Sequence, residues 1–173
     1  MAREASATMT VILSAILRDT ATTRLSMPQA IESFEISKTY STGTTDGQFD
    51  RVYTKSDTIS ASGTAAFDLA GALTDSLGQS ITMTEIVAIA ISNNATVAGV
   101  DIQVGAGSNP LTTLFGATAD YILLKPGGFH IYSSYYDGGG YAVTAGSADT
   151  LTLTNASGST AAPYTIWIVG RSA

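Results

Sequence analysis

The sequence has no cysteine and few ionic side chains. Charged residues make up 13% of its 173 positions, about half the share usual in a soluble globular protein. The absence of cysteine excludes a disulfide framework and a thiolate zinc site, and it leaves the redox compartment open. The scarcity of charge excludes long, charge-rich surface helices. Serine, threonine and the turns marked by 17 glycines must therefore supply most of the polar surface.

Basic residues are fewer than acidic residues. Eight Lys and Arg residues stand against 14 Asp and Glu residues, which gives a net charge of −6. Such a charge opposes sequence-independent binding to nucleic acid or to anionic lipid. We therefore expect no nucleic-acid partner.

Long hydrophobic runs are also absent. The longest unbroken apolar run covers only residues 86–91, whereas a membrane-spanning helix needs about 20 residues, so we expect no membrane partner. Arg3 precedes the apolar stretch 9–17 in an arrangement like that of a signal peptide. Glu4 and the Arg18-Asp19 pair oppose that interpretation, and we favour a short arm that leads into a first strand.

The patterns that are present are those of β-strands. The strand-like segments are 8–17, 31–40, 51–60, 64–69, 81–92, 97–104 and a series of shorter ones between 121 and 169. The first is apolar on both of its faces and is expected to be covered on both. The stretch 81–92 is the richest in β-branched residues, which predicts a central strand.

Closely spaced turn signals such as 126–128 and 137–140 separate the short strands. This spacing is typical of an antiparallel sandwich or barrel rather than of βαβ units. We expect an all-β, jelly-roll-like antiparallel sandwich of about nine or ten strands. The spacing of Leu69, Leu73 and Leu77 allows at most a short helical turn at 69–77. An N-terminal arm over 1–8 and a single sandwich domain over 9–173 are the expected organisation.

Residues with catalytic or ligand-binding potential are few. His130 is the only histidine, and no Gly-x-Ser-x-Gly nucleophile motif accompanies it; a hydrolase with His130 as its base is the open alternative. Asp137 lies among glycines, where a hairpin loop is favoured over a calcium site. Asn94 and Asn155 match the glycan-acceptor pattern, which arises often by chance in a chain rich in Ser and Thr. We predict a non-enzymatic protein with no catalytic residue, cofactor or metal.

The candidate residues for an interface are of two kinds. Tyr132, Tyr135 and Tyr136, with Asp137, form an aromatic cluster of the type that is enriched where proteins meet partners; the alternatives are an anchor at the edge of the core and a sugar-stacking surface. The second kind is the N-terminal arm, since an extended arm can add a strand to a neighbour's sheet edge. Its first residues are Met1, Ala2, Arg3 and Glu4.

Four stretches carry a resemblance to a known class of proteins: DLAGALTD at 68–75, LKPGG at 124–128, GYAVTAG at 140–146 and IWIVGRSA at 166–173. With the opening strand, they resemble the small β-sandwich virion proteins encoded among the structural genes of tailed bacteriophages. The likeness runs from about residue 8 to 173. It depends on turns and strand patterns, not on catalytic residues.

That resemblance implies a capsid cement or decoration protein, or a small part of the neck, tail or fibre. We expect a homo-oligomer, with a trimer as the first expectation, that binds the major capsid protein or other virion proteins. An acidic, hydroxyl-rich chain without cysteine suits the outer surface of the capsid. The alternative is a tail component that binds a receptor or a carbohydrate; no residue of the sequence specifically supports a glycan ligand.

Overall fold

The computed structural model describes residues 5–18, 29–71, 73–135 and 140–173. Within these ranges the protein is almost entirely β, as predicted. The ten longer strands are β1 (Ala7–Arg18), β2 (Gln29–Thr42), β4 (Arg51–Ile59), β5 (Thr64–Asp68), β8 (Glu85–Asn93), β9 (Ile102–Gly105), β10 (Ile122–Leu124), β11 (Phe129–Ser133), β13 (Thr150–Asn155) and β14 (Ala162–Arg171). The two-residue strands are β3 (Gln48–Phe49), β6 (Leu73–Thr74), β7 (Ser80–Ile81) and β12 (Tyr141–Ala142), and the helix α1 covers Thr112–Phe115.

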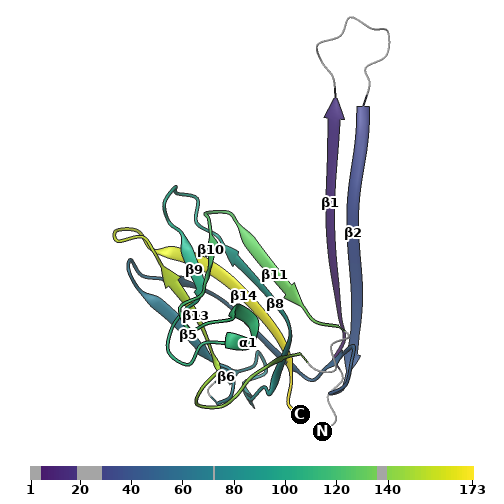
Figure 1. The fold of residues 1–173 in the computed structure, drawn as a ribbon, viewed down its shortest axis with the longest axis vertical. Coiled ribbons are helices and arrows are strands. Elements are labelled where there is room, and N and C mark those ends of the chain that lie inside the picture. The colour runs from purple at the N-terminus through teal and green to yellow at the C-terminus, as the bar shows by residue number, and fades with distance from the viewer. Residues whose placement is uncertain (1–4, 19–28, 72, 136–139) are drawn as a thin grey trace, which may run out of the picture.

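Eight of the longer strands, together with the two-residue strand β12, form a sandwich (Figure 1). One sheet has the order β11-β8-β14-β4, with β12 also paired to β8, and the other has the order β10-β9-β13-β5. All pairs in both sheets are antiparallel. The connections from β4 to β5, β8 to β9, β10 to β11 and β13 to β14 each pass from one sheet to the other. This alternation is the strand order of a jelly roll, so the expected fold is confirmed.

The core lies between the two sheets. Strand β8 is central in its sheet, and its side chains Ile86, Ile89 and Ile91 are almost fully buried. Leu151 and Leu153 of β13 face them from the other sheet and are likewise buried. The β-branched stretch that predicted a central strand therefore forms one, although the structure separates Ser80–Ile81 as the short strand β7.

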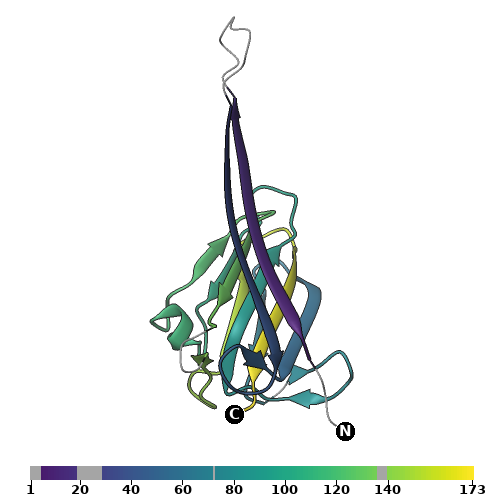
Figure 2. The ribbon, with the colours of Figure 1, turned by 90° about the vertical axis from the view of Figure 1, so that its right-hand side faces the viewer.

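The strands β1 and β2 are not part of the sandwich. They pair antiparallel over the whole length of β1, from Ala7 opposite Tyr40 to Arg18 opposite Gln29, and we call this unit the hairpin. It starts beside the five-stranded sheet and projects well past the sandwich (Figures 1 and 2). At a rise of about 3.4 Å per residue, a strand of 12 residues is about 40 Å long.

One detail of the predicted fold is wrong. The first strand was expected to be covered on both faces, but Ile12 and Leu13, which lie on opposite faces, are 62% and 61% exposed. For 69–77 the sequence allowed at most a short helical turn, and the described residues of that segment contain none. There Leu69 and Leu73 are buried while Leu77 is exposed, so the three leucines share no helix face. The described helix, α1, lies instead at Thr112–Phe115. No helix in the described ranges is long and apolar enough to cross a membrane.

A buried arginine joins the sandwich to the segment that follows the hairpin. The side chain of Arg171, at the end of β14, is 2% exposed, and its Nη1 lies 2.9 Å from Glu85 Oε2 of β8. Its Nε also donates a hydrogen bond of 3.1 Å to the carbonyl oxygen of Gln48 in β3, and β3 pairs with β2. Arg171 therefore connects β8, β14 and the base of the hairpin.

We expect the Arg171→Ala variant to lose about 2 kcal/mol of unfolding free energy, because it removes a buried side chain together with its hydrogen bonds to Glu85 and to the carbonyl oxygen of Gln48. Urea denaturation of the purified chain measures this loss. Lys55→Ala is the control, since the Lys55–Asp57 pair is exposed and such pairs contribute little. Equal shifts of the unfolding midpoint in the two variants would contradict this role of Arg171.

Candidate interaction surface

The two faces of the hairpin differ in chemistry. On the inner face, which is turned toward the sandwich, the cross-strand pairs are Met9 with Lys38, Val11 with Ile36, Leu13 with Phe34 and Ala15 with Glu32. On the outer face they include Thr8 with Thr39, Thr10 with Ser37, Ile12 with Glu35 and Ser14 with Ser33. The hydroxyl groups of Thr10 and Ser37 lie 3.1 Å apart across the strands. The inner face is thus mainly apolar, and the outer face is rich in hydroxyl groups.

The base of the hairpin is fixed to the outer face of the five-stranded sheet. Tyr40 is buried, and its ring makes edge contacts with Tyr135 and Phe49 at centroid distances of 5.2 and 6.5 Å. The Tyr40 and Ser133 hydroxyl groups lie 2.6 Å apart, which ties β2 to β11. Gly47 has φ +67°, and a Cβ at this position would lie 3.0 Å from the Tyr135 ring. The turn after β2 therefore packs directly on this cluster.

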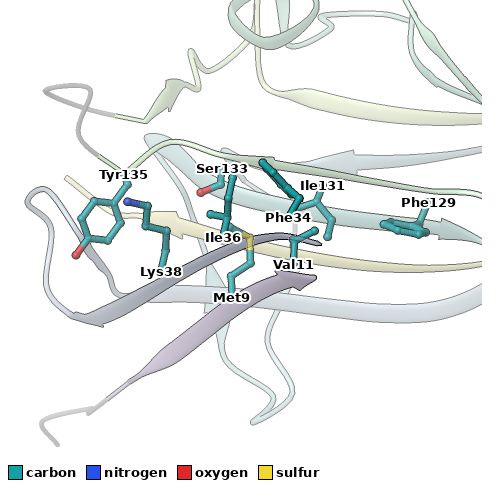
Figure 3. Close-up of a pocket in the computed structure, with 9 residues that line it drawn as sticks. All are labelled: Met9, Val11, Phe34, Ile36, Lys38, Phe129, Ile131, Ser133 and Tyr135. Carbon is teal, nitrogen blue, oxygen red and sulfur yellow. The ribbon is translucent and has the colours of Figure 1, made fainter. Parts of the chain in front are cut away.

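Beyond the base, the hairpin and β11 enclose a groove (Figure 3). Its volume is about 440 Å³, and it is lined by Met9, Val11, Phe34, Ile36, Lys38, Phe129, Ile131, Ser133 and Tyr135. The side chains of the hairpin and of β11 point toward the same space. Lys38 Nζ lies 5.0 Å from the centre of the Tyr135 ring, a cation–π contact. The walls are otherwise mainly apolar.

Phe129 stands at the centre of a larger apolar surface. Its side chain is 66% exposed. It lines the groove and also two adjoining hollows. One hollow lies along the hairpin beside Leu13 and Phe34, and the other lies on the sheet beside Ala90 and Trp167. Among the described residues, seven of the eleven exposed large hydrophobic side chains belong to the hairpin or to β11; they are Ile12, Leu13, Ile31, Phe34, Ile36, Phe129 and Ile131. Because monomeric proteins rarely expose large contiguous apolar patches, this surface is the candidate interaction surface of the described residues.

The predicted tyrosine cluster is only partly described. Tyr132 packs against the sandwich core and makes an edge contact with Phe115 at 6.3 Å. Tyr135 packs in the cluster at the base of the hairpin and also lines the groove. Both rings are partly buried, and their role at an interface stays a prediction. Tyr136 and Asp137 lie outside the described residues, as do the predicted docking residues Met1, Ala2, Arg3 and Glu4.

His130 packs against a neighbouring aromatic ring of the same strand. As strand alternation predicts, it lies on the face of β11 opposite Phe129 and Ile131, and its ring stacks on Tyr132 at 5.8 Å. Burial, with a smaller contribution from Tyr141, raises the pKa of Tyr132 above its ordinary value. Within the described ranges, no three His, Asp or Glu side chains gather closely enough to hold a metal ion.

The inner face of the hairpin was not among the residues singled out from the sequence. The sequence did contain evidence for this face, because apolar and hydroxyl side chains partly alternate along 8–17 and 31–40. In the first segment Val11 and Leu13 lie on one face and Thr10 and Ser14 on the other. Alternation of this kind does not distinguish a face turned to the core from one turned to a partner. Only the position of the hairpin in the structure shows that this face is not covered by the core.

Comparison with known proteins identifies no relative: no family model, no curated protein and no solved structure matches the chain.

We expect Tyr135→Ala to loosen the base of the hairpin and to lower the unfolding free energy by about 2 kcal/mol, since a partly buried aromatic ring is removed. Hydrogen exchange followed by mass spectrometry should show faster exchange in peptides from 38–42, with little change in β13. Tyr121→Ala is the control because Tyr121 is exposed and distant from the cluster. Unchanged exchange at 38–42 would contradict the anchoring role of Tyr135.

Proposed function

We propose that this protein is a non-enzymatic structural component of a tailed-bacteriophage virion that binds the exterior of the capsid and stabilises or decorates the shell. The observation that carries the proposal is the projecting hairpin, whose inner face joins Phe129 and Ile131 in one exposed apolar surface. A surface of this kind suits a protein whose work is to pack against other proteins.

The anchoring of the hairpin supports an assembly role. An isolated two-stranded hairpin is marginally stable in water, and here both faces carry large exposed apolar side chains, such as Ile12 and Leu13. The base is nevertheless held firmly by Tyr40 and its neighbours. A stiffly anchored arm with uncovered apolar faces is stabilised when a neighbouring subunit covers it.

The fold and the charge are consistent with this role. Jelly rolls occur in viral capsid proteins, but also in lectins and cupins, so the fold does not decide the function. The net charge of −6 disfavours contact with packaged DNA. The phage assignment itself depends on the resemblance of the four sequence stretches described above.

The location of the chain tests the proposal. In an electron cryo-microscopy map of phage particles that contain this protein, we expect jelly-roll densities at many equivalent sites over the outside of the shell. A few copies at the neck, tail or fibres would overturn the capsid assignment and favour the tail alternative. Absence of the chain from purified particles would overturn the structural role altogether.

The robustness of the particles tests stabilisation separately from decoration. Particles that lack the protein should assemble but release DNA at a lower temperature and break more readily under osmotic shock, because many weak contacts repeated over the shell are lost. Restoring the purified protein to these particles is the control. If particles without the protein are as robust as complete ones, stabilisation is wrong and decoration alone stands.

A further inference from the structure

We propose that the free edge of β2 pairs with the same edge of a second copy of this chain, so that two hairpins join in one antiparallel four-stranded sheet about a two-fold axis at Glu35. The proposal concerns the edge of the hairpin and leaves the groove unoccupied. It requires only the purified chain, so it can fail while the virion assignment stands, and the reverse also holds.

The first argument is that this edge of β2 is open. Within the described residues, the edge of β2 opposite β1 is paired only at Ser41 and Thr42, with β3, and residues 31–37 are all exposed. Along the upper part of the hairpin, β2 lies on the side of β1 that is away from the sandwich (Figure 1). A strand added to this edge meets unpaired backbone N–H and C=O groups, and it extends away from the chain's own sandwich.

The second argument is the nearly palindromic sequence of the strand. The segment Ser-Phe-Glu-Ile-Ser is symmetric in residue type about its centre, Glu35. Antiparallel pairing about a two-fold axis at Glu35 places Phe34 opposite Ile36 on the inner face. It places Ser33 opposite Ser37 on the outer face. Residues directly opposite in a strand pair lie on the same face of the sheet, so apolar side chains meet apolar ones and hydroxyl groups meet hydroxyl groups, as a two-fold contact of one patch with its own copy requires.

Charge complementarity selects the register. Glu32 and Lys38 lie at equal distances along the strand on either side of Glu35, and both lie on the inner face. Pairing about Glu35 therefore sets Lys38 of each copy opposite Glu32 of the other, and opposite charges at facing positions stabilise a strand pair. A slip by two residues in one direction leaves Lys38 opposite Phe34. A slip in the other direction leaves Glu32 opposite Ile36, and either slip removes both ion pairs.

Glu35 is the unfavourable element of the pairing. On the axis its carboxylate faces the Glu35 carboxylate of the other copy, and like charges directly opposite are destabilising. Both side chains lie on the exposed outer face, where water and salt screen the repulsion. One screened repulsion therefore stands against two ion pairs and two apolar pairs. Charges of this kind ordinarily protect an edge strand from pairing, and here they restrict it to one partner strand in one register.

The pairing is extensive enough for a specific dimer. When residues 31–39 of the two copies lie opposite one another, an antiparallel ladder gives about nine backbone hydrogen bonds, which is about the number in a typical protein–protein interface. The paired segment ends before Ser41, where β3 already occupies the edge. The hairpin also grows from two strands to four, and three or more strands with a hydrophobic face are needed for independent stability.

Mixing two charge variants tests the register. Light scattering and sedimentation should give the intact chain a mass twice its 17.8 kDa. Glu32→Lys alone and Lys38→Glu alone should each weaken the dimer by about tenfold, since each sets like charges opposite each other in both ion pairs. An equimolar mixture of the two variants should recover the dimer, because every facing position then carries opposite charges. A mixture that dimerises no better than its components would overturn the register.

Two variants of β4 are the matched controls. Asp57→Lys and Lys55→Glu make the same changes of net charge as the test variants at an exposed ion pair, and they should leave the mass unchanged whether alone or mixed. Circular dichroism should show the same fold for all four variants. Weakening by the control variants as large as that by the test variants would overturn the proposed ion pairs.

Removing the charge on the axis should have the opposite effect. Glu35→Gln should strengthen the dimer severalfold, because it removes the one like-charge contact of the pairing. A weaker dimer of the folded Glu35→Gln variant, measured by sedimentation over a range of concentrations, would overturn the position of the axis.

Because the sequence has no cysteine, a single introduced thiol reports which edge pairs. Glu35→Cys should give a disulfide-linked dimer on oxidation, since facing residues of a strand pair have Cβ atoms about 5 Å apart, close to the separation that a disulfide spans. Thr10→Cys lies on the same outer face but on β1, away from the axis, and should stay unlinked. A folded monomer at all concentrations, a trimer, or linkage through Thr10→Cys in place of Glu35→Cys would overturn the proposal.

Discussion

The contact between the base of the hairpin and the outer face of the five-stranded sheet is the constraint on which the rest of the structure depends. Tyr40, Phe49 and Tyr135 form its apolar part, and the buried Arg171 holds the β3 segment beside them. Without this contact, β1 and β2 would be an isolated hairpin with little stability of its own. With it, the hairpin has a fixed direction, and its inner face is presented beside β11 as the wall of a groove.

The sandwich could be predicted from the sequence because its signals are local. Short alternating strands separated by closely spaced glycine turns indicated the fold class, and the β-branched stretch at 81–92 indicated the central strand β8, which is buried on both faces. The absence of a helical turn from the described residues of 69–77 has a physical cause. Three leucines at four-residue spacing satisfy a helix, but Leu69 and Leu73 are buried in the sandwich core from a turn and a two-residue strand, while Leu77 points to solvent.

The groove could not be predicted because the same pattern serves two purposes. Strand 8–17 is apolar on both faces, which in a single domain indicates a strand buried between layers. In this protein no layer covers either face at this point of the strand, since Ile12 and Leu13 are both exposed. The tyrosines were conspicuous in the sequence, and Tyr132 and Tyr135 are partly buried, with Tyr135 also in the wall of the groove. Phe129, three residues before the first of them, was not singled out, although it is the exposed aromatic residue at the centre of the surface.

The small number of charged residues has a consequence at the edges of the sheets. Proteins protect exposed edge strands with charged side chains, proline or bulges. The free edge of β1 and the edge strand β11 have little of this protection: the described side chains of β1, from 7 to 15, include no charged residue, and β11 carries no Asp, Glu, Lys or Arg. Edges left unprotected in this way invite pairing and packing with another chain. The scarcity of ions that excluded charged helices therefore also leaves open the surfaces through which a neighbour would be bound.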